Sequence, residues 1–142
     1  MAAQTISIAM SNPYGDCDAG DNKIVIDWTS ATGGAVSAAI CTLFSAAQLL
    51  IGPFTVQPVK LKGFLRKFET NPGATKPTDN YDITLLDEEG YDVLGGAAAD
   101  RDQDNSESIV PSAPIYIDSE LTLTIASAGD EKAGQVIIFM TK

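Results

Sequence analysis

Short runs in which apolar and polar residues alternate recur along the chain, and this period of two constrains the fold more than any other feature. In residues 23–29, Ile24, Ile26 and Trp28 fall on one face and polar residues fall on the other. Successive side chains of a β-strand point to opposite faces of a sheet, so this run predicts a half-buried strand. The same alternation is found in residues 59–67, 81–85 and 121–125.

The segments between and beyond these runs complete a β pattern. Asp87-Glu88-Glu89-Gly90 predicts a hairpin turn between two strands, with Gly90 supplying a positive φ. Residues 136–140 (VIIFM) are apolar on both faces, which indicates either a central strand or a strand covered by a partner. Helix is expected at most once, as a short helix within residues 42–51. The sequence therefore predicts an all-β fold, a single β-sandwich over residues 1–142, and a jelly roll is one arrangement of its eight or nine strands.

Charge and composition narrow the classes of partner. The chain has 142 residues, with 19 acidic and 9 basic side chains and a net charge of −10. Such a polyanion repels phosphate backbones and anionic lipid surfaces, so we expect neither nucleic acid nor membrane as a partner. Residues 35–51 carry no charge but are shorter than the roughly 20 residues that a membrane-spanning helix needs. We interpret them as a buried strand followed by a short helix.

Two acidic clusters suggest calcium at first sight. Asp100, Asp102 and Asp104 alternate like the first ligands of an EF-hand loop, but that loop also requires Gly at its sixth position and Glu at its twelfth. Here those positions hold Asn105 and Pro111. The second cluster consists of Asp16, Asp18 and Asp21. We interpret both as solvated acidic loops and predict no metal ion.

We predict no enzymatic activity and no cofactor. The chain has no histidine, so no Ser–His or Cys–His pair can form. A catalytic carboxylate needs a partly buried position that perturbs its pKa, whereas the acidic residues here lie in or beside an exposed hairpin. These residues are Asp82, Asp87, Glu88, Glu89 and Asp92. Cys17 and Cys41 match no zinc or redox motif. The sequence is compatible with two free thiols and with a disulfide between them.

Charges are segregated along the chain. Residues 79–107 contain ten acidic residues and a single basic one, Arg101, whereas residues 59–67 contain four basic residues and no acidic one. The basic residues are Lys60, Lys62, Arg66 and Lys67. Two interpretations follow from this pattern: neutralisation within the molecule, or docking to a partner in a single orientation.

The C-terminal half of the chain carries a longer pattern. It comprises residues 71–96 (NPGATKPTDNYDITLLDEEGYDVLGG), residues 97–107 and residues 121–139 (LTLTIASAGDEKAGQVIIF). This pattern resembles a family of small structural proteins encoded among the virion genes of tailed bacteriophages. The matching elements are Pro72-Gly73, residues 77–82, the turn at 87–90, residues 92–94 and residues 128–130, which together span a little over half the chain. Residues 42–57 have no counterpart in that pattern.

The resemblance implies a capsid decoration (cement) protein, made in the cytoplasm of the host bacterium and bound to the outer capsid surface of the virion. Its partners would be the major capsid protein and itself, most often as a homotrimer. Apolar strands and sheet edges that a monomer leaves uncovered favour an oligomer. The residues expected at the oligomer or capsid interface are Lys60, Lys62, Arg66, Ile138 and Met140.

The alternative function is a carbohydrate- or receptor-binding module of a virion appendage, such as a head fibre or the tail. Such a module should expose aromatic side chains on its loops. Most aromatic residues of this chain fall in strand-like runs, and only Tyr14 and Tyr91 do not. The sequence therefore favours the structural role.

Overall fold

The computed structural model describes residues 5–10, 22–30, 36–40 and 61–141, and these form nine strands and no helix. The all-β prediction is confirmed. The expected short helix at residues 42–51 lies outside the described residues. The strands are β1 (Thr5–Met10), β2 (Asn22–Thr29), β3 (Val36–Ile40), β4 (Leu61–Pro72), β5 (Asp82–Leu86), β6 (Glu107–Ile109), β7 (Ile115–Ser119), β8 (Leu121–Ala126) and β9 (Ala133–Thr141).

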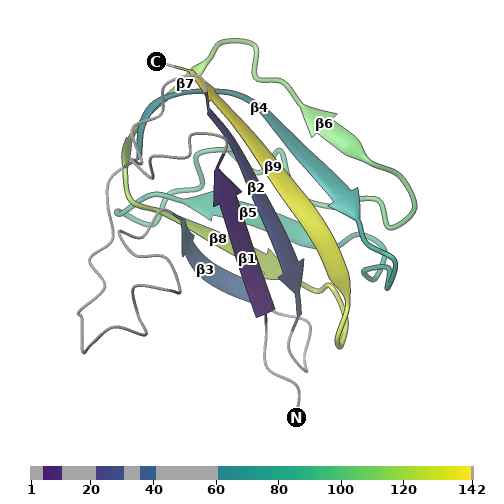
Figure 1. The fold of residues 1–142 in the computed structure, drawn as a ribbon. Helices are drawn as coiled ribbons and strands as arrows, with labels where there is room; N and C mark the ends of the chain where they lie inside the picture. Colours follow the sequence, from purple (N-terminus) through teal and green to yellow (C-terminus); the bar gives the residue numbers. More distant parts are fainter. Residues whose placement is uncertain (1–4, 11–21, 31–35, 41–60, 142) are drawn as a thin grey trace, which may run out of the picture.

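The strands form two antiparallel sheets that pack face to face (Figure 1). The larger sheet has the order β1-β2-β9-β4, and both β6 and β7 pair with the remaining edge of β4. The smaller sheet has the order β3-β8-β5. Because the larger sheet is the wider of the two, its outer surface is the broadest regular surface of the described molecule.

The strand pairing is nested. β2 pairs with β9, β3 with β8, and β4 with β7, as if one long hairpin had been rolled up so that its strands alternate between the two sheets. This order is that of a jelly roll, a double Greek-key sandwich. The place beside β5, where a fourth strand of the smaller sheet would lie, is taken by residues 92–101. They are joined to the β5 side by the bridges Tyr81–Arg101 and Leu86–Asp92.

The turn at residues 87–90 forms as predicted, but its second arm does not become a strand. The amide N–H of Gly90 donates to the Asp87 carbonyl at 3.0 Å, and Gly90 has a φ of 87°. The chain then pairs only at Asp92 before Gly95 and Gly96, both with positive φ, turn it back on itself. Consecutive residues in that region of φ cannot continue a strand.

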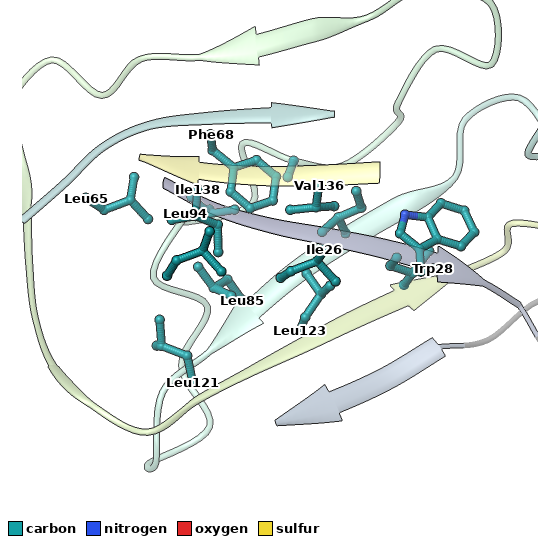
Figure 2. Close-up of a cluster of buried hydrophobic side chains, with 14 of the residues drawn as sticks. Ile26, Trp28, Leu65, Phe68, Leu85, Leu94, Leu121, Leu123, Val136 and Ile138 are labelled. Atoms are coloured by element: carbon teal, nitrogen blue, oxygen red, sulfur yellow. The ribbon is translucent and has the colours of Figure 1, made fainter. Parts of the chain in front are cut away.

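The core lies between the sheets and consists of the inward residues of the alternating runs (Figure 2). Ile24, Ile26 and Trp28 of β2 are buried, as their spacing predicts. They meet Ile83 and Leu85 from β5 and the apolar residues Leu121, Leu123 and Ile125 of β8. Each fully buried aliphatic or aromatic side chain stabilises the fold by about 1.5–3 kcal/mol, so this layer provides most of the driving force for folding.

β4 contains a β-bulge that determines which of its side chains lie on the outer side of the sheet. Leu65 pairs with Met140 and Lys67 pairs with Phe139, so Arg66 is an extra residue without a partner on β9. Leu65 and Phe68 are both buried although they are three residues apart, which strict alternation would not allow. The bulge brings both into the core, and as a consequence Arg66 and Lys67 both remain on the outer side.

β9 is a central strand between β2 and β4, which accounts for its apolar sequence. Val136, Ile138 and Met140 point into the core, whereas Ile137 and Phe139 point to the outer side of the sheet, where Ile137 is 8% exposed and Phe139 is half-buried. Ile138 is 0% exposed and Met140 is 2% exposed. The assignment of these two residues to an interface is therefore corrected: their side chains are enclosed between the sheets and offer no surface to a partner.

Candidate interaction face

The outer surface of the larger sheet combines basic and aromatic side chains, and we call it the cationic face. Its members come from β2, β4, β7 and β9, which the pairing places side by side. The basic members are Lys23, Lys62, Arg66 and Lys67, and the apolar members are Val25, Phe64, Tyr116 and Phe139. Ile137 points to the same side but is buried, and the acidic residues Asp27, Glu69 and Asp118 share this side of the sheet. A sheet holds such side chains in fixed register, so the face is a rigid surface.

Phe139 lies at the centre of the face between two lysines. Both Lys23 on β2 and Lys67 on β4 are register partners of Phe139. Their ammonium nitrogens lie 5.9 and 5.2 Å from the centre of the Phe139 ring. Each contact of this kind contributes about 0.5–1 kcal/mol at an exposed site, and the lysine stems cover part of the ring while their charges stay in water.

A second aromatic pair extends the face toward the sheet edge. Phe64 on β4 and Tyr116 on β7 are register partners, and their ring centres lie 5.4 Å apart with a tilt of 60° between the planes. Tyr116 remains 60% exposed. An aromatic side chain fixed by a neighbour but open to water loses little entropy on contact, and tyrosine and arginine are enriched among the residues that dominate binding energy.

The exposed positive charges of the face are only partly used within the molecule. Nε of Arg66 donates to Oγ1 of Thr141 at 2.8 Å, which fixes the guanidinium but leaves its two terminal nitrogens without a partner in the described part of the chain. Lys67 forms an ion pair with Glu69 at 2.5 Å. Lys62 is the register partner of Asp118, and both side chains are exposed. The Arg66 guanidinium is thus positioned to bind a carboxylate from outside.

Carboxylates beside β5 hold turns together. Oδ1 of Asp92 accepts the amide N–H groups of Leu85 and Leu94 at 3.0 and 3.1 Å, and Oδ2 accepts that of Gly96 at 2.9 Å. Oδ1 of Asp87 accepts those of Glu89 and Tyr91 at 3.0 and 2.9 Å. These carboxylates accept hydrogen bonds from backbone amides that would otherwise pair with a fourth strand of the smaller sheet or stay unpaired in the turn.

The loop at residues 100–107 uses its acidic groups in the same way. Asp102 accepts the amide of Asp104 at 2.7 Å and the side-chain amide of Asn105 at 2.9 Å. Asp104 forms an ion pair with Lys76. The described residues contain no group of three or more carboxylates or thiols arranged to hold a metal ion, and Asp16, Asp18 and Asp21 lie outside them.

We expect an acid-sensitive contribution to stability from Asp102. The hydrogen bond from the Asn105 side chain, followed by that from the Asp104 amide, lowers the pKa of Asp102. The unfolded pKa is about 3.9. The carboxylate therefore stabilises the fold above that pH, and this contribution is lost as the pH falls through the lower, folded value.

The measurement is the melting temperature between about pH 5 and pH 2, the range over which such a carboxylate takes up its proton. The melting temperature of an Asp102→Ala variant should fall less steeply with acidification than that of the wild type. Asn105→Ala should reproduce part of this change, because it removes the strongest cause of the lowered pKa. Parallel curves for the wild type and Asp102→Ala would contradict the assignment.

Of the five predicted interface residues, the structure places two on the cationic face: Lys62 and Arg66. Lys60 lies outside the described residues, and Ile138 and Met140 lie in the core. Sequence reasoning missed the other members of the face, among them Lys23, Phe64, Tyr116 and Phe139. For Lys23 and Phe64 the sequence does contain a signal of an outward position, because each alternates with buried residues within its run.

In the described part of the chain, no helix is long and apolar enough to cross a membrane. No protein-family model matches the chain, and neither the curated proteins nor the solved structures contain a significant match.

Proposed function

We propose that the chain is a structural protein of a phage virion, a capsid decoration protein that adds to the outer surface of the shell. The observation that carries this proposal is the cationic face itself. On this sheet surface Lys23 and Lys67 flank the Phe139 ring, on a molecule whose net charge is −10. Jelly-roll sandwiches are used repeatedly in viral capsids, although fold alone does not give function.

The charge distribution supports docking in one orientation. Residues 79–107 include β5 of the smaller sheet and carry ten acidic residues, whereas the outer face of the larger sheet carries four basic residues beside three acidic ones, Asp27, Glu69 and Asp118. A molecule with this asymmetry is steered toward an acidic partner surface by its cationic face and is repelled in other orientations. The acidic remainder then faces solvent, which keeps decorated particles apart.

A second candidate, a carbohydrate- or receptor-binding module of a virion appendage, is favoured by one observation. Tyr91, which follows the turn at residues 87–90 after β5, is 72% exposed and lies beside acidic residues. An exposed aromatic ring with hydrogen-bonding neighbours suits a sugar ring. Loss of glycan or receptor binding in a Tyr91→Ala variant that still adds to capsids would support this role.

The test of the proposed function is addition of the purified protein to capsids that lack it. The wild type should bind at saturating, stoichiometric levels, and Arg66→Glu should bind at least about tenfold more weakly, because it reverses the exposed charge of the bulge. Lys76→Glu makes the same change of charge away from the cationic face and serves as the matched control. Failure of the wild type to bind capsids, or equal loss in the control, would overturn the proposal.

A further inference from the structure

We propose that the open edge of β1 (Thr5–Met10) receives an extended segment of the capsid protein, which adds to the larger sheet as a further strand. The inference rests on the proposed function and deepens it by naming the element of the partner that is held. The edge of a sheet presents a row of backbone N–H and C=O groups, and an extended backbone is the structure that pairs with the whole row.

β1 is a regular edge strand. It pairs with β2 along its whole length, from Thr5–Thr29 to Met10–Ile24, without a register shift. No described strand pairs with its other side, so β1 ends the larger sheet in the described part of the chain (Figure 1). Alternate residues of an antiparallel strand turn their backbone groups to the same side, which leaves about three N–H and three C=O groups on the open side. The sequence of β1, TISIAM, has no charged residue and no proline, which are two of the devices that protect a sheet edge.

The opposite edge of the larger sheet has such protection. β7 covers residues 61–65 of β4, and β6 covers residues 68–70. β6 has only three residues, and the link from β6 to β7 contains Pro111 and Pro114, which have no amide hydrogen to donate. β7 carries the exposed charge of Asp118. Short strands, prolines and charges of this kind oppose the addition of a further strand.

The edge of β5 in the smaller sheet is closed by the chain itself. The Val93 amide donates to the Leu85 carbonyl at 2.8 Å, and the Ile83 amide donates to the Ala98 carbonyl at 3.0 Å. The Leu85 amide donates to the Asp92 carboxylate at 3.0 Å. These bonds use backbone groups of β5 that face away from β8, so a strand from another protein finds few free partners there.

The register of β1 indicates which kind of segment fits its open edge. In β2, the strand that β1 pairs with, the buried residues Ile24, Ile26 and Trp28 alternate with residues on the outer side. A strand added to β1 continues these rows, so it needs apolar residues at alternate positions. Because the chain has a net charge of −10, a segment without acidic residues is favoured. β1 belongs to the sheet that carries the cationic face, so the added strand extends the surface proposed to meet the capsid.

The experiment is hydrogen exchange of single amides, in the free protein and in the protein bound to capsids that were assembled without it. In the free protein, the β1 amides that point away from β2 should exchange quickly. On capsids their exchange should slow at least about tenfold, because they gain hydrogen bonds. β3 (Val36–Ile40) is also an uncharged edge strand, and its exchange should stay unchanged. Slow exchange of those β1 amides in the free protein would overturn the inference, because the chain itself or a second copy would already cover the edge.

Ser7→Lys tests the same edge through binding, and Ser37→Lys is its matched control. Each variant places a lysine on an uncharged edge strand, since Ser7 pairs with Asp27 of β2 and Ser37 pairs with Thr124 of β8. A lysine on an edge strand opposes the addition of a further strand, so Ser7→Lys should weaken addition to capsids at least about tenfold. Ser37→Lys should leave it unchanged.

The outcomes separate this inference from the proposed function. If the wild type adds to capsids and Arg66→Glu does not, but the β1 amides still exchange quickly, the inference is overturned and the proposed function stands. The same holds if Ser7→Lys binds as tightly as the wild type, or if Ser7→Lys and Ser37→Lys lose binding equally. A wild type that does not add to capsids overturns both.

Discussion

Ile138→Asp is expected to unfold the protein, whereas Phe139→Asp, one residue further along β9, is expected to leave the fold intact. The Ile138 side chain is fully buried between the two sheets. A carboxylate there is desolvated without a partner, and it also leaves the space of the lost aliphatic group unfilled. The combined cost is on the order of 5 kcal/mol or more, comparable with the whole stability of a domain of this size.

Phe139 occupies the opposite face of the same strand, between Lys23 and Lys67. An aspartate at this position stays in contact with water and meets two positive charges, so the expected loss of stability is about 1–2 kcal/mol. Urea unfolding followed by circular dichroism measures both variants. Equal stability of the two variants, or a folded Ile138→Asp protein, would show that β9 is not oriented as the structure places it.

Gly134→Ala is expected to destabilise the fold by about 3 kcal/mol although it adds a single methyl group. A Cβ atom at Gly134 would lie 2.5 Å from Cζ2 and 2.8 Å from Cε2 of Trp28, closer than carbon atoms can approach. The indole cannot move away freely, because Trp28 is buried and packs against Tyr81 with ring centres 5.9 Å apart. The backbone of β9 or the indole must therefore shift.

The measurement uses Trp28 itself, since it is the single tryptophan of the chain. Urea unfolding followed by its fluorescence should give a lower midpoint for Gly134→Ala and a native emission maximum that differs from that of the wild type. Ala126→Val adds two methyl groups at an exposed position of β8 and should change stability by less than about 0.5 kcal/mol. Native emission and stability equal to those of the wild type in Gly134→Ala would contradict the packing of Trp28 on Gly134.

The strands and the sides that they bury could be predicted where the sequence alternates. Ile24, Ile26 and Trp28 are buried as their period of two indicates, and Tyr81, Ile83 and Leu85 follow the same rule. In these runs the local pattern specifies the orientation of every side chain, because a strand with one buried face admits a single register.

Other features depend on contacts that no local pattern contains. Residues 136–140 are apolar on both faces, so their sequence does not show which side is the core. Ile138 and Met140, predicted at an interface, are buried, whereas Phe139 between them is half-buried on the outer side. The cationic face requires Lys23, Phe139 and Lys67 to meet, although more than a hundred residues separate the first two. That meeting follows from the nested pairing of the jelly roll, which no short segment specifies.

The most direct test of the proposed function is the copy number of the polypeptide in purified virions, measured by quantitative mass spectrometry against the major capsid protein. A decoration protein is expected at a fixed, high ratio to the major capsid protein that is the same in independent preparations, and it should be lost from particles when its gene carries Arg66→Glu. Virions that lack the polypeptide, or that contain only the few copies typical of a tail appendage, would contradict the account.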